Sequence, residues 1–81
     1  MDLSGEQVVV TGACGALGRA VCARAAALGA RVIGLDIVRA DVPGCSAVHA
    51  VDLGDAAATS TCIAGLGRVD ALFNVAGGFA M

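Results

Sequence analysis

The hydrophobic pattern of the first half of the chain predicts a strand, a helix and a second strand. A nearly continuous valine run at residues 6–11 predicts a strand buried on both faces. An alanine-rich pattern over residues 16–28 predicts an amphipathic helix. Its apolar stripe consists of Leu17, Val21, Ala25 and Leu28. A short apolar run at residues 31–36 completes a β-α-β unit of about thirty residues, the usual size for a right-handed crossover.

The second half of the chain predicts two more strands and one helix. Residues 37–45 contain the single proline and predict a loop in place of a full crossover helix. Strands are expected at residues 46–51 and 69–73, and a helix at residues 54–65. Three poor helix formers, Thr59, Ser60 and Thr61, predict that this helix is short or partly exposed. The predicted fold class is therefore α/β.

Composition excludes several classes of partner. The 81 residues allow one domain, and the five arginines are spread singly along a chain of net charge −2, so we expect no nucleic acid partner. The mean hydropathy is +0.86, but no uncharged run approaches the roughly 20 residues needed to cross a bilayer. The acidic start at residues 1–6 lacks a basic signal region. These features predict a cytoplasmic protein without a membrane partner.

The cysteines and the single histidine predict no metal site. The four cysteines show no C-x-x-C spacing, and we expect them to be free, buried thiols. His49 has no second ligand at a suitable spacing and is expected to be a surface side chain of a strand.

A glycine-rich loop follows the first predicted strand. Its glycines are Gly12, Gly15 and Gly18, and the predicted helix begins at once. In such a turn the first glycine permits an unusual backbone conformation, the second admits a pyrophosphate, and the third lets helix and strand pack closely. The helix N-terminus then favours an anion. Glycine spacing alone also occurs in purely structural turns.

Polar side chains follow three further predicted strands. They are Asp36, Asp52 and Asn74, and the carboxyl ends of parallel strands meet at the ligand-binding edge of an open α/β sheet. Asp36 lies 24 residues after Gly12, where a carboxylate accepts hydrogen bonds from the adenosine ribose. Its charge would repel a 2′-phosphate, which favours NAD over NADP.

These motifs resemble those of the short-chain dehydrogenases/reductases. Residues 11–18 resemble the T-G-x(3)-G-x-G cofactor loop, but the middle glycine falls one position early, at Gly15, a spacing usual in the extended, epimerase-like branch. Residues 74–77 resemble the N-x-A-G motif of the classical branch. We favour the classical branch, and a fragment of an extended-type sugar-nucleotide epimerase or dehydratase remains an alternative. The resemblance implies a partial Rossmann fold, an open parallel sheet of about four strands in the order 3-2-1-4 flanked by helices.

The resemblance also implies a role for each matching residue. Gly12, Gly15, Gly18 and the amide of Leu17 would line the phosphates, and Asp36 would hold the adenosine ribose. The Asp52 side chain and the Leu53 backbone would meet the adenine amino group. Three residues would border the ribose and steady the fourth strand, namely Asn74, Ala76 and Gly77.

The catalytic residues of the family, a serine and a Tyr-x-x-x-Lys pair, lie beyond the part that this chain resembles. The sequence contains no tyrosine and its basic residues are all arginines, so we expect no catalytic residue here. We therefore expect residues 1–81 to be the truncated, N-terminal NAD-binding half of a Rossmann domain. The parent would transfer hydride between NAD and an alcohol or carbonyl, and its missing C-terminal part or another copy would cover the fourth strand. A non-catalytic dinucleotide-binding or interaction module is the alternative.

Overall fold

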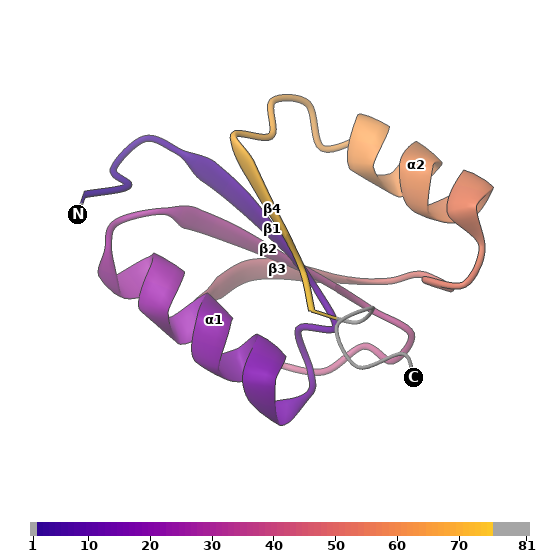
Figure 1. Cartoon of the computed structure of the whole chain (residues 1–81), viewed down its shortest axis with the longest axis horizontal. Coiled ribbons are helices and arrows are strands. Elements are labelled where there is room, and N and C mark those ends of the chain that lie inside the picture. Colours follow the sequence, from indigo (N-terminus) through magenta and orange to yellow (C-terminus); the bar gives the residue numbers. More distant parts are fainter. Residues whose placement is uncertain (1, 76–81) are drawn as a thin grey trace.

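The computed structural model describes residues 2–75 and shows a four-stranded parallel sheet with a helix on each face (Figure 1). The strands are β1 (Gln7–Thr11), β2 (Arg31–Asp36), β3 (Cys45–Ala50) and β4 (Ala71–Asn74). The helices are α1 (Ala16–Ala27) and α2 (Ala56–Ala64). The strand order β3-β2-β1-β4 confirms the predicted 3-2-1-4 sheet. All six elements lie within a few residues of their predicted positions.

The two central strands carry the core on both of their faces. On the α1 side, Val8, Val10 and Val32 pack with Cys22 and Ala25 of α1. On the α2 side, the buried residues are Val9, Ile33 and Leu35. This arrangement explains the unbroken valine run of β1, since a parallel strand covered on both faces has no solvent side that needs polar residues.

Helix α1 packs through smaller residues than its sequence predicts. The residues that it buries are Gly18, Cys22 and Ala25. The predicted stripe is therefore wrong for Leu17, which is 48% exposed, whereas Val21 is partly buried and packs against the core on this face. The small side chains that α1 buries leave room for the helix to pack directly on the sheet.

The second crossover and helix α2 are more open. The described connection between β2 and β3 has no helix, as predicted, and a hollow of about 1050 Å³ lies along the outer edge of β3. Asp55 caps α2 by accepting a hydrogen bond from the backbone N–H of Ala58 at 3.0 Å. Helix α2 has no fully buried residue, which confirms the prediction of a partly exposed helix.

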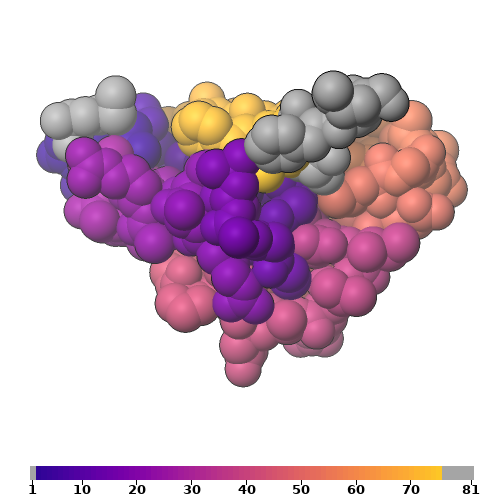
Figure 2. Space-filling view, turned by 60° about the horizontal axis from the view of Figure 1, so that its bottom comes forward, coloured from indigo at the N-terminus to yellow at the C-terminus, as the bar shows by residue number. Residues whose placement is uncertain are grey.

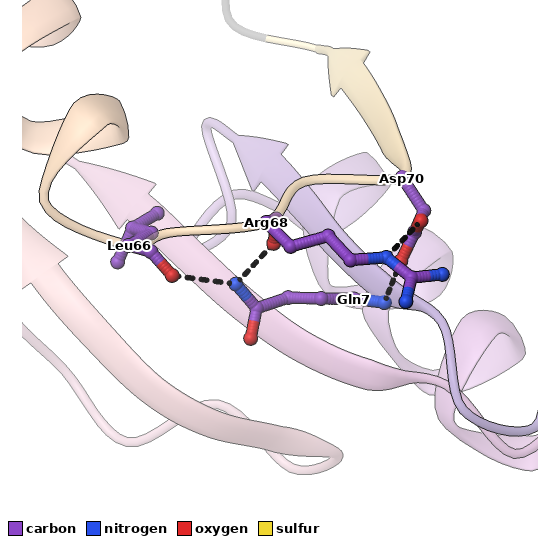
Figure 3. A network of polar contacts seen from close by, with 4 residues as sticks. All are labelled: Gln7, Leu66, Arg68 and Asp70. Atoms are coloured by element: carbon purple, nitrogen blue, oxygen red, sulfur yellow. Dashed lines mark hydrogen bonds and ion pairs between the residues drawn. The ribbon is translucent and has the colours of Figure 1, made fainter.

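The amino ends of β1 and β4 are joined by a polar network (Figure 3). Gln7 and Asp70 exchange two bonds: the Gln7 N–H donates to Asp70 Oδ2 at 2.8 Å, and the Asp70 N–H donates to the Gln7 carbonyl at 2.9 Å. Gln7 Nε2 also donates to the carbonyls of Leu66 and Arg68, at 3.1 and 2.8 Å. Arg68 Nε lies 2.7 Å from Asp70 Oδ1. This network attaches the segment after α2 to the start of β1.

The cysteines are free, but only one of them is fully buried. Cys22 is buried, whereas Cys14, Cys45 and Cys62 are partly exposed, so the expectation of four buried thiols is wrong for three of them. Burial, followed by the hydrogen bond with the Cys45 side chain, raises the pKa of Cys22 to about 12. Cys22 is therefore a neutral thiol at neutral pH. His49 is exposed on β3, as expected.

Within residues 2–75, no helix is both long enough and apolar enough to cross a membrane. The same residues contain no group of three or more His, Cys, Asp or Glu side chains able to hold a metal ion.

Candidate functional site

The glycine-rich loop turns sharply at the carboxyl end of β1. The N–H groups of Gly12 and Ala13 both point to the Leu35 carbonyl of β2, at 2.7 and 3.3 Å. Gly12 has a φ of +71°, a conformation that strongly favours glycine. The Gly15 N–H donates back to the Gly12 carbonyl at 3.2 Å. The chain therefore leaves the central strand and enters α1 within a few residues.

Gly15 and Gly18 serve different purposes in this loop. A Cβ atom added to Gly18 would lie 2.0 Å from the Gly12 carbonyl oxygen, so the packing of α1 against the loop requires glycine. A Cβ atom on Gly15 would meet only that same oxygen, at an ordinary 3.6 Å. The protein's own packing does not require glycine at residue 15, and its missing side chain leaves room for a ligand beside the start of α1.

The N-terminus of α1 has no anionic group of its own. Gly15 occupies the cap position without a side-chain hydrogen bond, and the first turn contains no acidic residue. Helix α2, in contrast, has Asp55 at this position. The first N–H groups of a helix lack partners within the helix and form its positive end. The start of α1 can therefore accept an anion such as a phosphate.

Asp36 lies beside this loop at the end of β2. Its Oδ2 accepts a hydrogen bond from the Cys14 N–H at 2.9 Å, and its Oδ1 accepts one from the Ile37 N–H at 2.7 Å. Each carboxylate oxygen keeps a further lone pair for a hydroxyl donor. Asp36 lines a cavity of about 290 Å³ together with Gly12, Gly15, Ala16, Leu17, Gly18 and Val75. The structure thus brings together five of the predicted site residues.

A second cavity, of about 390 Å³, lies on the α2 side of the same sheet edge. Leu53 and Asn74 line it together with Thr11. Thr11 is only 5% exposed, and its Oγ1 donates to Asn74 Oδ1 at 2.8 Å. Asn74 therefore ties the end of β4 to the end of β1, where the two residues are also paired in register.

Three predicted residues remain. Asp52 lines neither cavity itself, but its Oδ1 accepts the Gly54 N–H at 3.0 Å in the turn before α2, and Gly54 lines the second cavity. Ala76 and Gly77 lie outside the described residues.

Two features of the site were not expected from the sequence. Arg19 donates from Nε to the Cys14 carbonyl at 2.9 Å and from Nη1 to the Asp41 carbonyl at 3.3 Å. In Figure 2 the start of α1, in dark violet, lies at the surface beside the magenta segment after β2. Ile37 and Val38, which directly follow Asp36, are exposed and apolar. The sequence did contain a signal for the exposed apolar surface of Ile37 and Val38, because both residues lie in a predicted loop. No feature of the sequence indicated the role of Arg19.

The order of the strands, the glycine-rich turn and the uncapped start of α1 define a Rossmann-type dinucleotide-binding domain. The family model described as "NAD dependent epimerase/dehydratase family" matches residues 8–80. The chain belongs to the NAD dependent epimerase/dehydratase family.

Two known proteins support this relationship. L-xylulose reductase of Bos taurus is 38% identical over 81 residues, an alignment that covers 91% of this chain and 33% of that protein. The solved structure of uronate dehydrogenase from Agrobacterium tumefaciens matches with a TM-score of 0.68 and 30% identity, over 86% of this chain and 26% of that one. The chain thus spans about a third or less of the length of these relatives. The predicted resemblance to short-chain dehydrogenases/reductases is confirmed, and a nicotinamide dinucleotide is the cofactor class of the family.

Proposed function

We propose that this chain binds the adenosine diphosphate half of NAD at the carboxyl ends of β1 and β2. The observation that carries the proposal is the single cavity where Gly15, the uncapped start of α1 and Asp36 meet. Such a cavity offers N–H donors to a pyrophosphate and a carboxylate to a ribose. These groups match the two ends of an adenosine diphosphate.

Each predicted residue receives a role in this proposal. The phosphates lie against Gly12, Gly15, Gly18 and the amide of Leu17. The two adenosine ribose hydroxyls donate to the free lone pairs of Asp36, and the exposed apolar side chain of Ile37 offers a surface for the adenine ring. Asp52 and Leu53 would meet the adenine amino group, although the Asp52 side chain of this structure is engaged with Gly54. Asn74, Ala76 and Gly77 would border the ribose and steady the fourth strand.

The carboxylate of Asp36 selects NAD over NADP in this proposal. The added 2′-phosphate of NADP would approach a negative charge, and two unit charges of like sign about 4 Å apart repel by about 1 kcal/mol in bulk water and about 4 kcal/mol near a protein surface. We expect NAD to bind at least about tenfold more tightly than NADP, measured by calorimetric titration of the chain with each cofactor. The substitution Asp36→Asn should narrow this difference, because it removes the charge and keeps the shape.

Asp41→Asn is the matched control for this experiment. Asp41 is exposed in the connection after β2, and its substitution removes the same charge without changing a side chain in the cavity. It should leave the preference for NAD nearly unchanged. Tighter binding of NADP than of NAD by the unaltered chain would contradict the assignment of Asp36.

For the protein that carries this domain we propose hydride transfer between NAD and an alcohol or carbonyl carbon. The relatives named as a reductase and a dehydrogenase support this reaction class. The chain has no tyrosine and no lysine, so its own proposed contribution is to hold the cofactor. The second candidate is a sugar-nucleotide epimerase or dehydratase, favoured by the position of Gly15 and by the family description. Analysis of the product, an oxidised alcohol or an epimerised sugar, would separate the two.

We also propose that further polypeptide, from the same protein or a second copy, covers the outer edge of β4. In the described residues β4 pairs with β1 on one side, and Leu72 and Phe73 are exposed. Phe73 lines an apolar cavity of about 540 Å³ with Leu3, Val21 and Leu28. Leu72 lines the cavity on the α2 side. An unpaired strand with apolar side chains on both faces favours the addition of another strand.

A further inference from the structure

The backbone of Cys14, in the middle of the glycine-rich loop, is held on both sides by charged side chains. Asp36 accepts its N–H at 2.9 Å, and Arg19 Nε donates to its carbonyl at 2.9 Å. Asp36 ends β2 and Arg19 lies in the first turn of α1, so the two groups reach the loop from different elements. Hydrogen bonds with a charged partner are stronger than neutral ones.

A loop of this composition needs such support if it is to bind phosphate well. Glycine residues leave the unbound backbone many conformations, and each must be given up when the N–H groups align on an anion. A loop that already has the binding shape avoids this entropic cost at the moment of binding. Groups that hold the shape therefore contribute to affinity without touching the ligand.

The hydrogen bonds of Arg19 distinguish it from an arginine that binds phosphate directly. Its guanidinium reaches two carbonyls on separate segments, those of Cys14 in the loop and Asp41 in the β2–β3 connection. Arg19 is also partly buried. A planar fork of N–H donors can bridge two acceptors in this way, whereas the single ammonium of lysine is a compact point charge.

We propose that Arg19 is a positioning residue that, together with Asp36, holds the glycine-rich loop in the shape that accepts a pyrophosphate. The proposal rests on the proposed function of the loop as a dinucleotide site. Arg19 contributes through the geometry of its hydrogen bonds and does not contact the cofactor. Its second hydrogen bond, to the Asp41 carbonyl, also holds the β2–β3 connection in a defined position relative to the loop.

The test compares two ligands and three variants of the full chain. Binding of ADP and of adenosine is measured by calorimetry or by NMR titration for the unaltered chain, Arg19→Gln, Arg19→Lys and the control Arg31→Gln. Arg31 is exposed at the amino end of β2, whereas the loop lies at the carboxyl ends of the strands, and its substitution removes the same charge. Amide hydrogen exchange of Cys14 is recorded without ligand, as a direct measure of loop order.

We expect Arg19→Gln to weaken ADP binding about tenfold, the effect of losing one charge-assisted hydrogen bond. Adenosine binding should change by less than about twofold, since it lacks the pyrophosphate. Exchange at Cys14 should become faster. Arg19→Lys should show the same defect, because it restores the charge but not the fork, and Arg31→Gln should behave like the unaltered chain.

Other results would overturn the proposal. Full recovery of ADP binding in Arg19→Lys would mean that Arg19 acts by charge on the phosphates. Unchanged ADP binding and exchange in Arg19→Gln would remove its positioning role, and an equal loss of ADP and adenosine binding would indicate a general structural role. Failure of the unaltered chain to bind ADP or NAD would instead refute the proposed function itself.

Discussion

At the scale of single residues, the three glycines of the loop are not equivalent. Gly12 provides a backbone conformation with φ of +71°, and Gly18 provides a contact that no Cβ atom could enter. Gly15 has an ordinary backbone conformation and nothing closer than 3.6 Å to an added Cβ atom. Its glycine is therefore explained by the ligand that we propose, since packing does not explain it.

This difference predicts opposite effects of two alanine substitutions. Gly18→Ala should lower the free energy of unfolding by about 3 kcal/mol, because the new methyl group overlaps the Gly12 backbone. Gly15→Ala should change it by less than about 1 kcal/mol, because a loss at the cap position offsets reduced freedom of the unfolded chain. Denaturant titration gives both values.

NAD binding tests the proposed role of Gly15. We expect Gly15→Ala to weaken NAD binding at least about tenfold while the fold is kept, as the methyl group occupies space beside the phosphates. A folded Gly15→Ala variant that binds NAD normally would contradict the proposed position of the pyrophosphate.

At the scale of elements, the network of Gln7, Arg68 and Asp70 aligns β4 with β1. The hydrogen bond from the Gln7 N–H, and then that from Arg68, hold the pKa of Asp70 below its usual 3.8. Asp70 in turn raises the pKa of Arg68, which stays charged throughout the acid range. The ionised carboxylate is thus part of the contact between two segments that are distant in the sequence.

The lowered pKa of Asp70 predicts an acid-dependent stability. The unfolded chain binds a proton at Asp70 more readily than the folded chain, so the stabilisation is complete above pH 3.8 and is lost as the pH falls through the lowered value. The melting temperature, measured between pH 7 and pH 2, should be higher for the unaltered chain than for Asp70→Asn at neutral pH. The two melting temperatures should become equal in acid. The melting temperature of the control Asp41→Asn should follow the same pH dependence as that of the unaltered chain. A difference between Asp70→Asn and the unaltered chain that stays the same at every pH would contradict the role of the ionised Asp70.

At the scale of the whole molecule, the sheet is covered unevenly. Helices α1 and α2 lie on opposite faces of the sheet (Figure 1). Strand β4, at one edge of the sheet, has the exposed side chains Leu72 and Phe73. The described residues thus combine a well-packed centre of β1 and β2 with an apolar edge that suits another strand.

This edge predicts that the chain associates with itself when no other polypeptide covers it. Sedimentation equilibrium should show a mass that rises with protein concentration. Leu72→Lys should shift the chain toward the monomer, because a charge on an edge strand opposes pairing. Val38→Lys is the control, since Val38 is 56% exposed, close to the 51% of Leu72, but lies after β2. A monomer at all concentrations, or an equal effect of Val38→Lys, would contradict the prediction.

The sequence determined the elements through local periodicity, so short stretches of sequence carry that information. Its resemblance to the short-chain dehydrogenases/reductases added the strand order, which periodicity alone does not give, and the polar residue at the end of the second predicted strand predicted that Asp36 lies at the same sheet edge as the glycine-rich loop. Tertiary structure alone decided that α1 buries Gly18 and Cys22 and exposes Leu17, that the Asp52 side chain bonds to Gly54 in the turn before α2, and that Arg19 and Asp36 hold Cys14. Local periodicity does not encode which helix face meets the sheet or which side chain finds which backbone group, because both depend on how the folded elements pack against one another.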